Sequence, residues 1–425
     1  MPDLACFPYA SVQFTKHGDV HDPAELEAAL RLAASGPTDV LTFVHGWNTD
    51  MVDAADLYRR LARVLCADPA AADRSHQFAV IGVLWPSKRF TEPARMPGGG
   101  ASLGGPAADV EDAVARLRAQ LDGTIDPTDL DEVTDLLRDV EDLGSARDRL
   151  VELVLARWPR DDLDPEELPT GFRDAPGGAA LLALAARPSV ADLGGVPRRD
   201  GTDVGAALGM FTGKGLAGAA NLLNVFTYFT MRHRAGVVGA RGVHAMLRAV
   251  RQRAPGVRLH LVGHSFGARL ATAAVQGTGS HVGVATLCLL QAAFSQHAFA
   301  ADVGGRSGLY RPVVAGGLVS GPILVTHTRN DRAVAIAYAL ASRIAGQVAS
   351  LVGRRDEFAG LGAVGAHPGT TPEALDVDAP PDWSEVRLTA GRVNNLDGDA
   401  VIEGHSDIAT PAVARAVWAA VGGDA

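Results

Sequence analysis

The amino-acid sequence predicts an α/β fold in which a mostly parallel, doubly wound sheet carries a large helical insertion. Two observations support this prediction. Short apolar runs alternate with helix-like segments toward both ends of the 425-residue chain, and a long stretch between them shows helical periodicity only. Continuous apolar runs are typical of parallel strands whose two faces are both covered by helices.

Residues 1–90 form the first alternating region, which we expect to be the N-terminal part of the core. Its apolar runs are rich in Val, Ile and Phe, and its helix-like segments place Leu and Ala at helical spacing. The expected strands are 6–14, 39–47 and 78–86, and the expected helices are 23–34 and 53–66.

Residues 91–235 interrupt the alternation, and we interpret them as a mostly helical insertion and a candidate cap or lid. A Gly- and Pro-rich break at 93–110 opens the insertion. The segment 126–167 contains 15 Asp and Glu against 5 Arg and Lys, so it alone accounts for the chain's net charge of −10. Helices are expected at 128–143, 146–158 and 178–186.

The segment 204–231 of the insertion is strongly apolar, with Lys214 as its only charge. Gly205, Gly209 and Gly213 stand four residues apart, a spacing found where membrane helices pack together. We expect no stable membrane span, because a central lysine and two asparagines lie within the segment. The remaining interpretations are one or two close-packed buried helices, or a mobile apolar lid over a binding cleft.

Residues 236–425 form the second alternating region, the C-terminal part of the expected core. A polar loop rich in Gly and Pro fills 352–383. The expected strands are 257–263, 282–294, 321–328 and 384–393, and the expected helices are 241–253, 266–276, 332–345 and 410–420.

Composition argues against several classes of function. An acidic chain of pI about 5.7 offers no broad basic face, so we expect no nucleic-acid partner. Cys6, Cys66 and Cys288 lack CxxC spacing and cannot all pair, so we expect no disulfide framework, no metal site and a reducing, cytoplasmic location. We also expect no signal peptide and no cofactor.

The motif Gly263-His264-Ser265-Phe266-Gly267 carries the first indication of chemistry. An apolar run before Ser265 predicts a strand, and the Ala-rich run after it predicts a helix, so a sharp turn would lift the hydroxyl above the sheet. Glycines on either side let neighbouring backbone pass close to this turn. The start of the helix directs N–H groups toward any negative charge that develops nearby.

A second match to Gly-x-Ser-x-Gly occurs at 100–104, with Ser102 in the middle. It lies in a glycine-rich loop and no strand precedes it, so only Ser265 has the sequence context of a nucleophile. The alternative for Ser265 is a serine that caps a buried helix.

A serine nucleophile needs a base, and the base needs a group that orients it. Asp331 lies just past an expected strand, and it is the first candidate acid, although helix capping is an alternative role. Asp397 and Asp399 are reserve candidates. His405 follows the last expected strand on a polar loop, which is the late position that a base takes in the order serine, acid, histidine.

The fourth element is the end of an expected strand at His45-Gly46-Trp47. A glycine at this position lets the following backbone fold inward, so the N–H groups of Trp47 and Phe266 can bind an oxyanion together. A second role is compatible with this one: the side chain of His45 can hold neighbouring loops together.

These four elements, in this order on this alternation of strands, resemble the α/β-hydrolase superfamily of serine esterases and lipases. The resemblance covers roughly residues 5–90 and 236–420. It differs from the family in one respect, since the insertion precedes the nucleophile strand, whereas the family's cap more commonly enters after the sixth strand.

The resemblance implies roles for individual residues. Ser265 is expected to be the nucleophile, Asp331 the acid, His405 the base, and the backbone of Trp47 and Phe266 the oxyanion hole. The expected reaction is cofactor-free hydrolysis of a carboxylic ester with a hydrophobic acyl or alcohol part, with transient membrane contact left open.

The sequence is also compatible with other functions. Thioesterase, amidase and acyltransferase activities use the same residues. A protein of a different class is also compatible with the sequence: one that keeps the fold without catalysis and binds a partner through the acidic segment 126–167.

Overall fold

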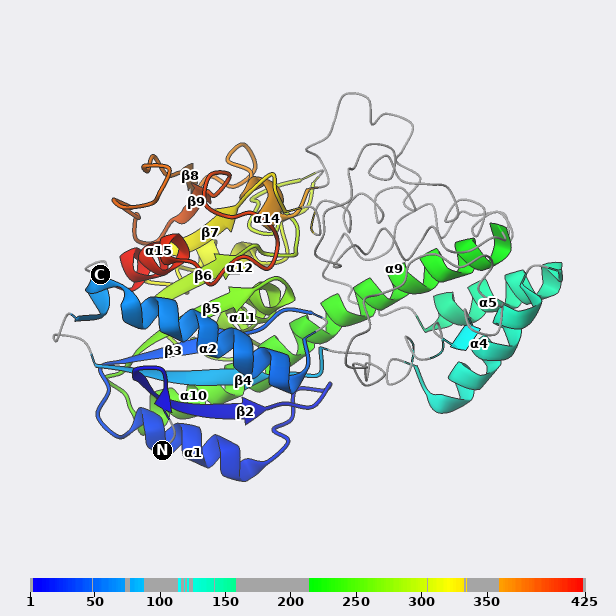
Figure 1. Ribbon diagram of the computed structural model, residues 1–425, viewed down its shortest axis with the longest axis horizontal. Coiled ribbons are helices and arrows are strands. Elements are labelled where there is room, and N and C mark those ends of the chain that lie inside the picture. The colour runs from blue at the N-terminus through cyan, green and yellow to red at the C-terminus, as the bar shows by residue number, and fades with distance from the viewer. Residues whose placement is uncertain are drawn as a thin grey trace, which may run out of the picture. The chain divides into compact units, whose positions relative to one another are not determined.

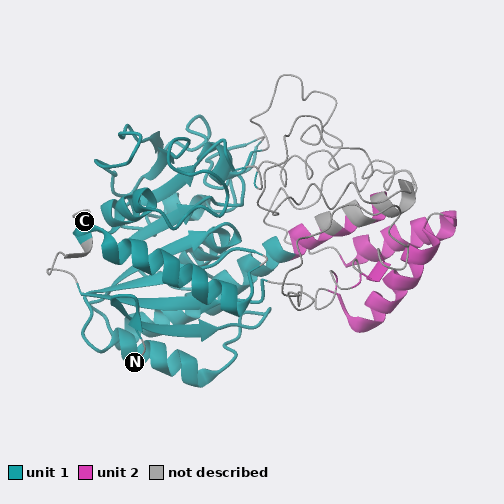
Figure 2. Cartoon of the chain, viewed as in Figure 1, with its two compact units in different colours: residues 1–88, 231–335, 356–425 teal, residues 89–230, 336–355 magenta. Residues whose placement is uncertain are grey.

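The computed structural model describes residues 3–47, 49–72, 77–87, 114–115, 118, 121, 125–140, 142–157, 214–303, 305–331, 334 and 359–422. The chain divides into two compact units (Figure 2). Unit 1 comprises Met1–Lys88, Met231–Ala335 and Asp356–Ala425, and unit 2 comprises Arg89–Thr230 and Ile336–Arg355.

Unit 1 is an α/β structure built on a nine-stranded sheet of order β1-β2-β4-β3-β5-β6-β7-β9-β8 (Figure 1). All neighbouring pairs are parallel except β1 and β2. The strands are β1 Asp3–Leu4, β2 Phe7–Gln13, β3 Asp39–Val44, β4 Phe78–Leu84, β5 Arg258–His264, β6 Thr286–Leu290, β7 Ile323–His327, β8 Ala374–Asp376 and β9 Val393–Asp397.

Helices pack on both faces of this sheet. One group, α1, α10 and α11, is linked by mutual contacts, and a second group is formed by α2 and α15. The bounds are α1 Pro23–Ala33, α2 Met51–Ala67, α10 His244–Arg253, α11 Phe266–Gln276 and α15 Pro411–Gly422, with shorter helices η1 Pro69–Ala72, α12 Arg311–Ala315 and α14 Leu361–Val364.

The core between the sheet and the pair α2 and α15 follows from the strand pleat. Leu41 and Phe43 of β3 and Leu290 of β6 are fully buried there, in the same hydrophobic cluster as Val413 and Val417 of α15. Alternate residues of a strand share one face, and each such fully buried side chain contributes about 1.5–3 kcal/mol. The opposite faces of the central strands are buried as well, which explains their continuous apolar runs.

The last strand differs from its expected position. Residues 384–392 form no strand, and the chain pairs with β7 only from Val393 onward. The prediction failed because β9 reads Val-Asn-Asn-Leu-Asp, and asparagine usually indicates a turn. Both asparagines are buried here and bonded to backbone: Asn394 donates to the carbonyl of Ile323, and Asn395 accepts from the N–H of Ala366. Within the loop expected at 352–383 lie α14 and β8.

Cys6 and Cys66 form a disulfide, so the argument against a disulfide framework is wrong for this pair. Their Cα atoms lie 6.0 Å apart, because the start of β2 and the end of α2 meet although 60 residues separate them in sequence. The cytoplasmic expectation loses its premise with this correction. Cys288 is a free, buried thiol whose pKa burial raises to about 12.

Unit 2 contains α4 Pro127–Asp139 and α5 Gly144–Ala156, which pack together, and the first part of α9 Lys214–Val237. The carboxylate of Asp129 is mostly buried and accepts two hydrogen bonds from Arg157, at 2.6 and 2.9 Å. Arg149 of α5 pairs with Glu132 of α4. Part of the acidity of segment 126–167 is therefore neutralised within the unit.

Several expectations lie outside the described residues: the helix at 178–186, the stretch 204–213 and most of the helix at 332–345. In the described part of α9, Leu222, Leu223 and Phe226 are buried. None of the helices in the described ranges is both long and apolar enough to span a membrane.

A π-helical turn, η3 Val238–Val243, joins α9 to α10. Two glycines within it allow very close packing. A Cβ on Gly239 would lie 2.2 Å from the carbonyl oxygen of Leu270 in α11, and one on Gly242 would lie 2.4 Å from that of Gly18. The backbone of the π-helical turn η3 therefore packs directly against α11 and against the loop that follows β2.

Candidate active site

A single residue, Ser265, separates β5 from α11, so the connection between strand and helix is sharp. Ser265 has φ 58° and ψ −124°, a conformation that non-glycine residues rarely adopt. Such backbone strain concentrates at functional sites, and this strand-turn-helix geometry is the one that exposes a nucleophilic hydroxyl above a sheet.

Three glycines make the turn possible because a side chain at any of them would collide with backbone or with the serine. A Cβ on Gly267 would lie 2.2 Å from the carbonyl oxygen of Val44, and a Cβ on Gly263 would lie 2.5 Å from that of Gly267. A Cβ on Gly46 would lie 2.8 Å from the Cβ of Ser265. The strand end at Gly46 therefore packs directly against the serine turn.

The structure brings Ser265, His405 and Asp331 together in one line of hydrogen bonds. Nε2 of His405 lies 2.8 Å from Oγ of Ser265, and Nδ1 lies 2.8 Å from Oδ2 of Asp331. Because the carboxylate accepts from Nδ1–H, the neutral imidazole has its lone pair on Nε2, facing the serine. This arrangement can remove a proton from the serine hydroxyl.

Asp331 is fully buried at the end of β7. Besides the histidine, it accepts the N–H of Val334 at 3.0 Å. The helix expected at 332–345 lies mostly outside the described residues, so the capping role stays a prediction. The reserve candidates lie elsewhere: Asp399 binds Thr328 and Arg329, and Asp397 accepts the N–H of Asp399.

His264 holds the backbone of His405. Its Nε2–H donates to the carbonyl oxygen of His405 at 2.8 Å, and the two ring centroids are 4.9 Å apart. Burial, together with the nearby His405, lowers the pKa of His264 to about 3, so its imidazole is neutral near pH 7. His264 thus fixes the loop that carries His405, a contact that sequence spacing did not reveal.

His45 fastens the loops after β3 and β4. Its Nε2 accepts the N–H of Trp85 at 3.3 Å, its Nδ1 lies 3.0 Å from the carbonyl oxygen of Gly46, and its ring stacks on that of Trp85. Complete burial lowers the pKa of His45 to about 4. The imidazole is therefore a neutral structural group rather than a base.

Trp47 and Phe266, the expected oxyanion donors, lie beside each other with ring centroids 5.7 Å apart. Phe266 is the first residue of α11, so its N–H belongs to the positive end of the helix dipole. The role of their backbone N–H groups as oxyanion donors stays a prediction.

Sequence reasoning missed Gln291, which directly follows β6. It is fully buried, has φ 45°, and its Nε2 lies 3.3 Å from Oδ2 of Asp331. The signal available in the sequence was a glutamine at the end of the apolar run Leu-Cys-Leu-Leu, where a buried polar side chain needs a partner.

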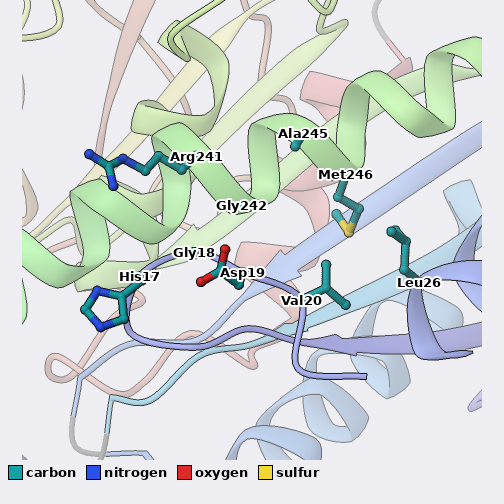
Figure 3. A pocket seen from close by; sticks show the side chains of 9 residues that line it. All are labelled: His17, Gly18, Asp19, Val20, Leu26, Arg241, Gly242, Ala245 and Met246. Carbon is teal, nitrogen blue, oxygen red and sulfur yellow. The ribbon is translucent and has the colours of Figure 1, made fainter. Parts of the chain in front are cut away.

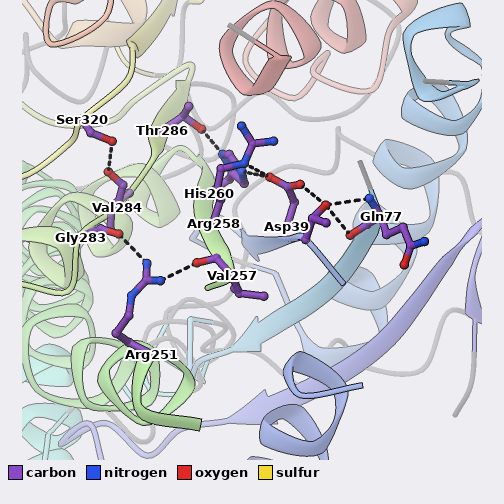
Figure 4. Close-up of polar contacts among 11 residues, drawn as sticks. Asp39, Gln77, Arg251, Val257, Arg258, His260, Gly283, Val284, Thr286 and Ser320 are labelled. Atoms are coloured by element: carbon purple, nitrogen blue, oxygen red, sulfur yellow. Dashed lines mark hydrogen bonds and ion pairs between the residues drawn. The ribbon is translucent and has the colours of Figure 1, made fainter. Parts of the chain in front are cut away.

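Two cavities lie in other parts of unit 1. One of about 410 Å³ is formed between the loop that contains His17 and Asp19 and the helical residues Arg241 and Met246 (Figure 3). The other, of about 200 Å³, lies at the amino ends of β5 and β6, where Arg251 donates to surrounding backbone carbonyls (Figure 4). Neither cavity is lined by a residue of the serine turn or by the base.

In the described part of the chain, no group of three or more His, Cys, Asp or Glu side chains is arranged to hold a metal ion. No protein-family model matches the chain, and neither the curated proteins nor the solved structures contain a similar protein at a significant level.

Proposed function

We propose that this protein is a serine hydrolase of the α/β-hydrolase type that cleaves carboxylic esters through an acyl-enzyme. The observation that carries the proposal is the hydrogen-bonded line from Ser265 through His405 to the buried Asp331, which begins at a strained turn between strand and helix. The order of the three residues along the chain agrees with this assignment.

In the first half of the proposed reaction, Nε2 of His405 takes the proton of Ser265 while Oγ attacks the ester carbonyl carbon. Asp331 stabilises the imidazolium that forms. The N–H groups of Trp47 and Phe266 bind the oxyanion of the tetrahedral intermediate. When the intermediate collapses, Nε2–H returns the proton to the leaving alcohol, and the acyl group remains on Oγ.

In the second half, a water molecule takes the place of the alcohol. His405 removes a proton from this water, whose oxygen attacks the acyl carbon, and the second tetrahedral intermediate releases a carboxylic acid as Oγ regains the proton. The fixed tautomer of His405 suits both halves, since the same nitrogen accepts and returns the proton.

Fluorophosphonate labelling with peptide mass spectrometry tests this proposal. We expect a covalent adduct on Ser265 that disappears in Ser265→Ala and is strongly reduced in His405→Ala. Ser102→Ala is the matched control, because it changes the serine of the second Gly-x-Ser-x-Gly match; labelling should persist in it. A folded wild-type sample without an adduct on Ser265 would contradict the proposal and favour a non-catalytic binding protein.

The proposed substrate is an ester with a hydrophobic part, because the chain carries the strongly apolar segment 204–231. A series of p-nitrophenyl esters of increasing acyl length tests this point. We expect kcat/KM to rise with chain length. If the rate increases abruptly at the concentration where the substrate aggregates, the enzyme acts at a lipid interface. If the rate shows no such step at aggregation, the substrates are dispersed molecules.

A further inference from the structure

Gln291 occupies a strained position next to the acid of the proposed triad. Its φ of 45° is unusual for a residue with a side chain, and its exposed fraction is 0%. Its backbone N–H donates to Oγ1 of Thr326 on β7 at 3.2 Å. A Cβ on Gly362 would lie 2.5 Å from the carbonyl carbon of Gln291, so the backbone is enclosed on this side as well.

The side-chain amide of Gln291 can adopt only one orientation. Its Oε1 accepts the hydroxyl of Thr326 at 2.8 Å, while its Nε2 donates to the carbonyl oxygen of Gly362 at 3.0 Å and to Oδ2 of Asp331 at 3.3 Å. A flipped amide would place Oε1 against two groups that only accept hydrogen bonds. The amide therefore presents a fixed N–H to the carboxylate.

The carboxylate of Asp331 is in turn held at both oxygens. Val334 donates to Oδ1, and Gln291 donates to Oδ2, the oxygen that also accepts Nδ1–H of His405. Rotation about the last side-chain bond of aspartate is otherwise soft. Two donors on different oxygens fix the plane of the carboxylate and thus the direction in which it accepts from the imidazole.

We propose that Gln291 is a positioning residue of the triad, which orients the Asp331 carboxylate toward Nδ1 of His405 without touching substrate. This inference rests on the proposed hydrolase function. The bonds to Thr326 and Gly362 satisfy Oε1 and one N–H of Nε2, and a purely structural role would require only that some acceptor satisfy the second N–H. In this structure the second N–H donates to Asp331, the carboxylate that orients His405.

Gln291→Glu provides the first test, because it keeps the shape of the side chain but adds a titratable group. A protonated Glu carboxyl can still donate to Asp331, whereas two adjacent carboxylates cannot both ionise without strong repulsion. We expect kcat/KM within about tenfold of wild type at the acidic end of the active range. As pH rises, activity should fall along a new descending limb that wild type lacks.

Gln291→Met removes the donor and keeps an unbranched side chain of similar volume. We expect kcat to fall about 10- to 100-fold at every pH, with KM little changed. Gln252→Glu, the same charge change at an exposed position of α10, should behave as wild type. Near-ultraviolet circular dichroism shows whether each variant keeps its tertiary packing.

A spectroscopic measurement separates this inference from the proposed function. The proton shared by Nδ1 of His405 and Asp331 should give a low-field NMR signal in wild type, and the signal should weaken or move in Gln291→Met. Wild-type kcat and an unchanged signal in that variant would overturn the inference, as would a Gln291→Glu pH profile that superimposes on wild type. Absence of any labelling of wild-type Ser265 would contradict the function alone, because the NMR signal still reports on the positioning.

Discussion

Unit 1 contains two arrays of carboxylate, imidazole and hydroxyl with nearly the same distances. In the outer array, Asp331, His405 and Ser265 are joined by contacts of 2.8 and 2.8 Å. In the inner array, Oδ1 of Asp39 lies 2.8 Å from Nε2 of His260, whose Nδ1 lies 2.9 Å from Oγ1 of Thr286 (Figure 4).

The surroundings of the two arrays differ. The inner histidine and hydroxyl lie on adjacent strands, and both residues are at most 3% exposed. The outer histidine lies on a loop with 21% of its side chain exposed, against 1% for the inner histidine. Ser265 is itself only 6% exposed, but it sits in a strained turn at a helix start. A hydrogen-bonded chain of this kind therefore does not define a nucleophile; an exposed histidine, backbone strain and a nearby helix N-terminus distinguish the reactive candidate.

The inner array also carries an additional cation. Burial raises the pKa of the Asp39 carboxyl, but hydrogen bonds from His260, Arg258 and Thr38 outweigh burial and hold that pKa well below its usual range. The ion pair between Arg258 and Asp39 measures 2.7 Å. The inner array thus holds three strands together through a fixed charge.

The largest expected difference concerns the two hydroxyls. Ser265→Ala should lower kcat for ester hydrolysis by about 10⁶-fold, because the nucleophile is lost. Thr286→Val should leave kcat within about twofold and lower the free energy of unfolding by ~1–3 kcal/mol, since His260 loses a buried partner. Ester turnover and urea unfolding measure both effects. A large loss of kcat in Thr286→Val would show that the inner array takes part in the reaction.

The two carboxylates should differ in the same way. Asp331→Asn should lower kcat about 10⁴-fold, because the amide no longer fixes the tautomer of His405. Asp39→Asn should keep kcat and reduce the free energy of unfolding by ~3–5 kcal/mol, since Arg258 and His260 lose a buried anionic partner. Denaturation midpoints and single-turnover rates test this pair, and equal kcat losses would remove the distinction between the arrays.

A region away from both arrays should affect stability alone. The double variant Cys6→Ser/Cys66→Ser opens a long disulfide loop and should lower the free energy of unfolding by ~2–4 kcal/mol. The rate of fluorophosphonate labelling at Ser265 should stay unchanged. Unfolding in urea with and without reductant provides the measurement, and wild type under reductant should match the variant. A slower labelling rate would show that the disulfide also affects the geometry of the active site.

A histidine outside both arrays should give the smallest effect. His45 titrates near pH 4 in the folded state and near 6.5 when unfolded, so the unfolded state binds more protons between these values. Its contribution to stability is complete above pH 6.5 and declines as pH falls toward 4. Between pH 7 and 5 the free energy of unfolding should drop by about 2 kcal/mol on this account.

Urea unfolding at several pH values checks the His45 prediction. His45→Gln should be less stable at pH 7 and should show a shallower decline on acidification. The matched control is His17→Gln, which changes an exposed histidine and should keep the wild-type slope. Identical slopes in the two variants would contradict the assignment.

Much of the fold was predictable because the buried strands are continuously apolar. The displaced last strand was not, since only tertiary partners reveal that Asn394 is a buried strand residue rather than a turn residue. The disulfide was missed for a similar reason, as nothing local brings Cys6 to Cys66.

Within the candidate site, the local pattern selected Ser265 as the candidate nucleophile, and chain order selected His405 as the candidate base. The choice between Asp331 and Asp399 required geometry, because both follow strand ends. The role of Gln291 depends on neighbours from other strands. The sequence did not reveal the inner array either, because 221 residues separate Asp39 from His260 and only the fold brings them together.

The two edges of the sheet have a consequence for behaviour at high concentration. In the described part of the chain, the sheet ends in β1, two residues long, and in β8, three residues long. A free strand edge can recruit another chain through backbone pairing, and short edge strands offer few groups for such recruitment. Assembly through β1 or β8 is thus disfavoured. Because β1 pairs only with Phe7 and Pro8 in the described register, edge-to-edge assembly of the native fold should instead use the later part of β2, from Tyr9 to Gln13.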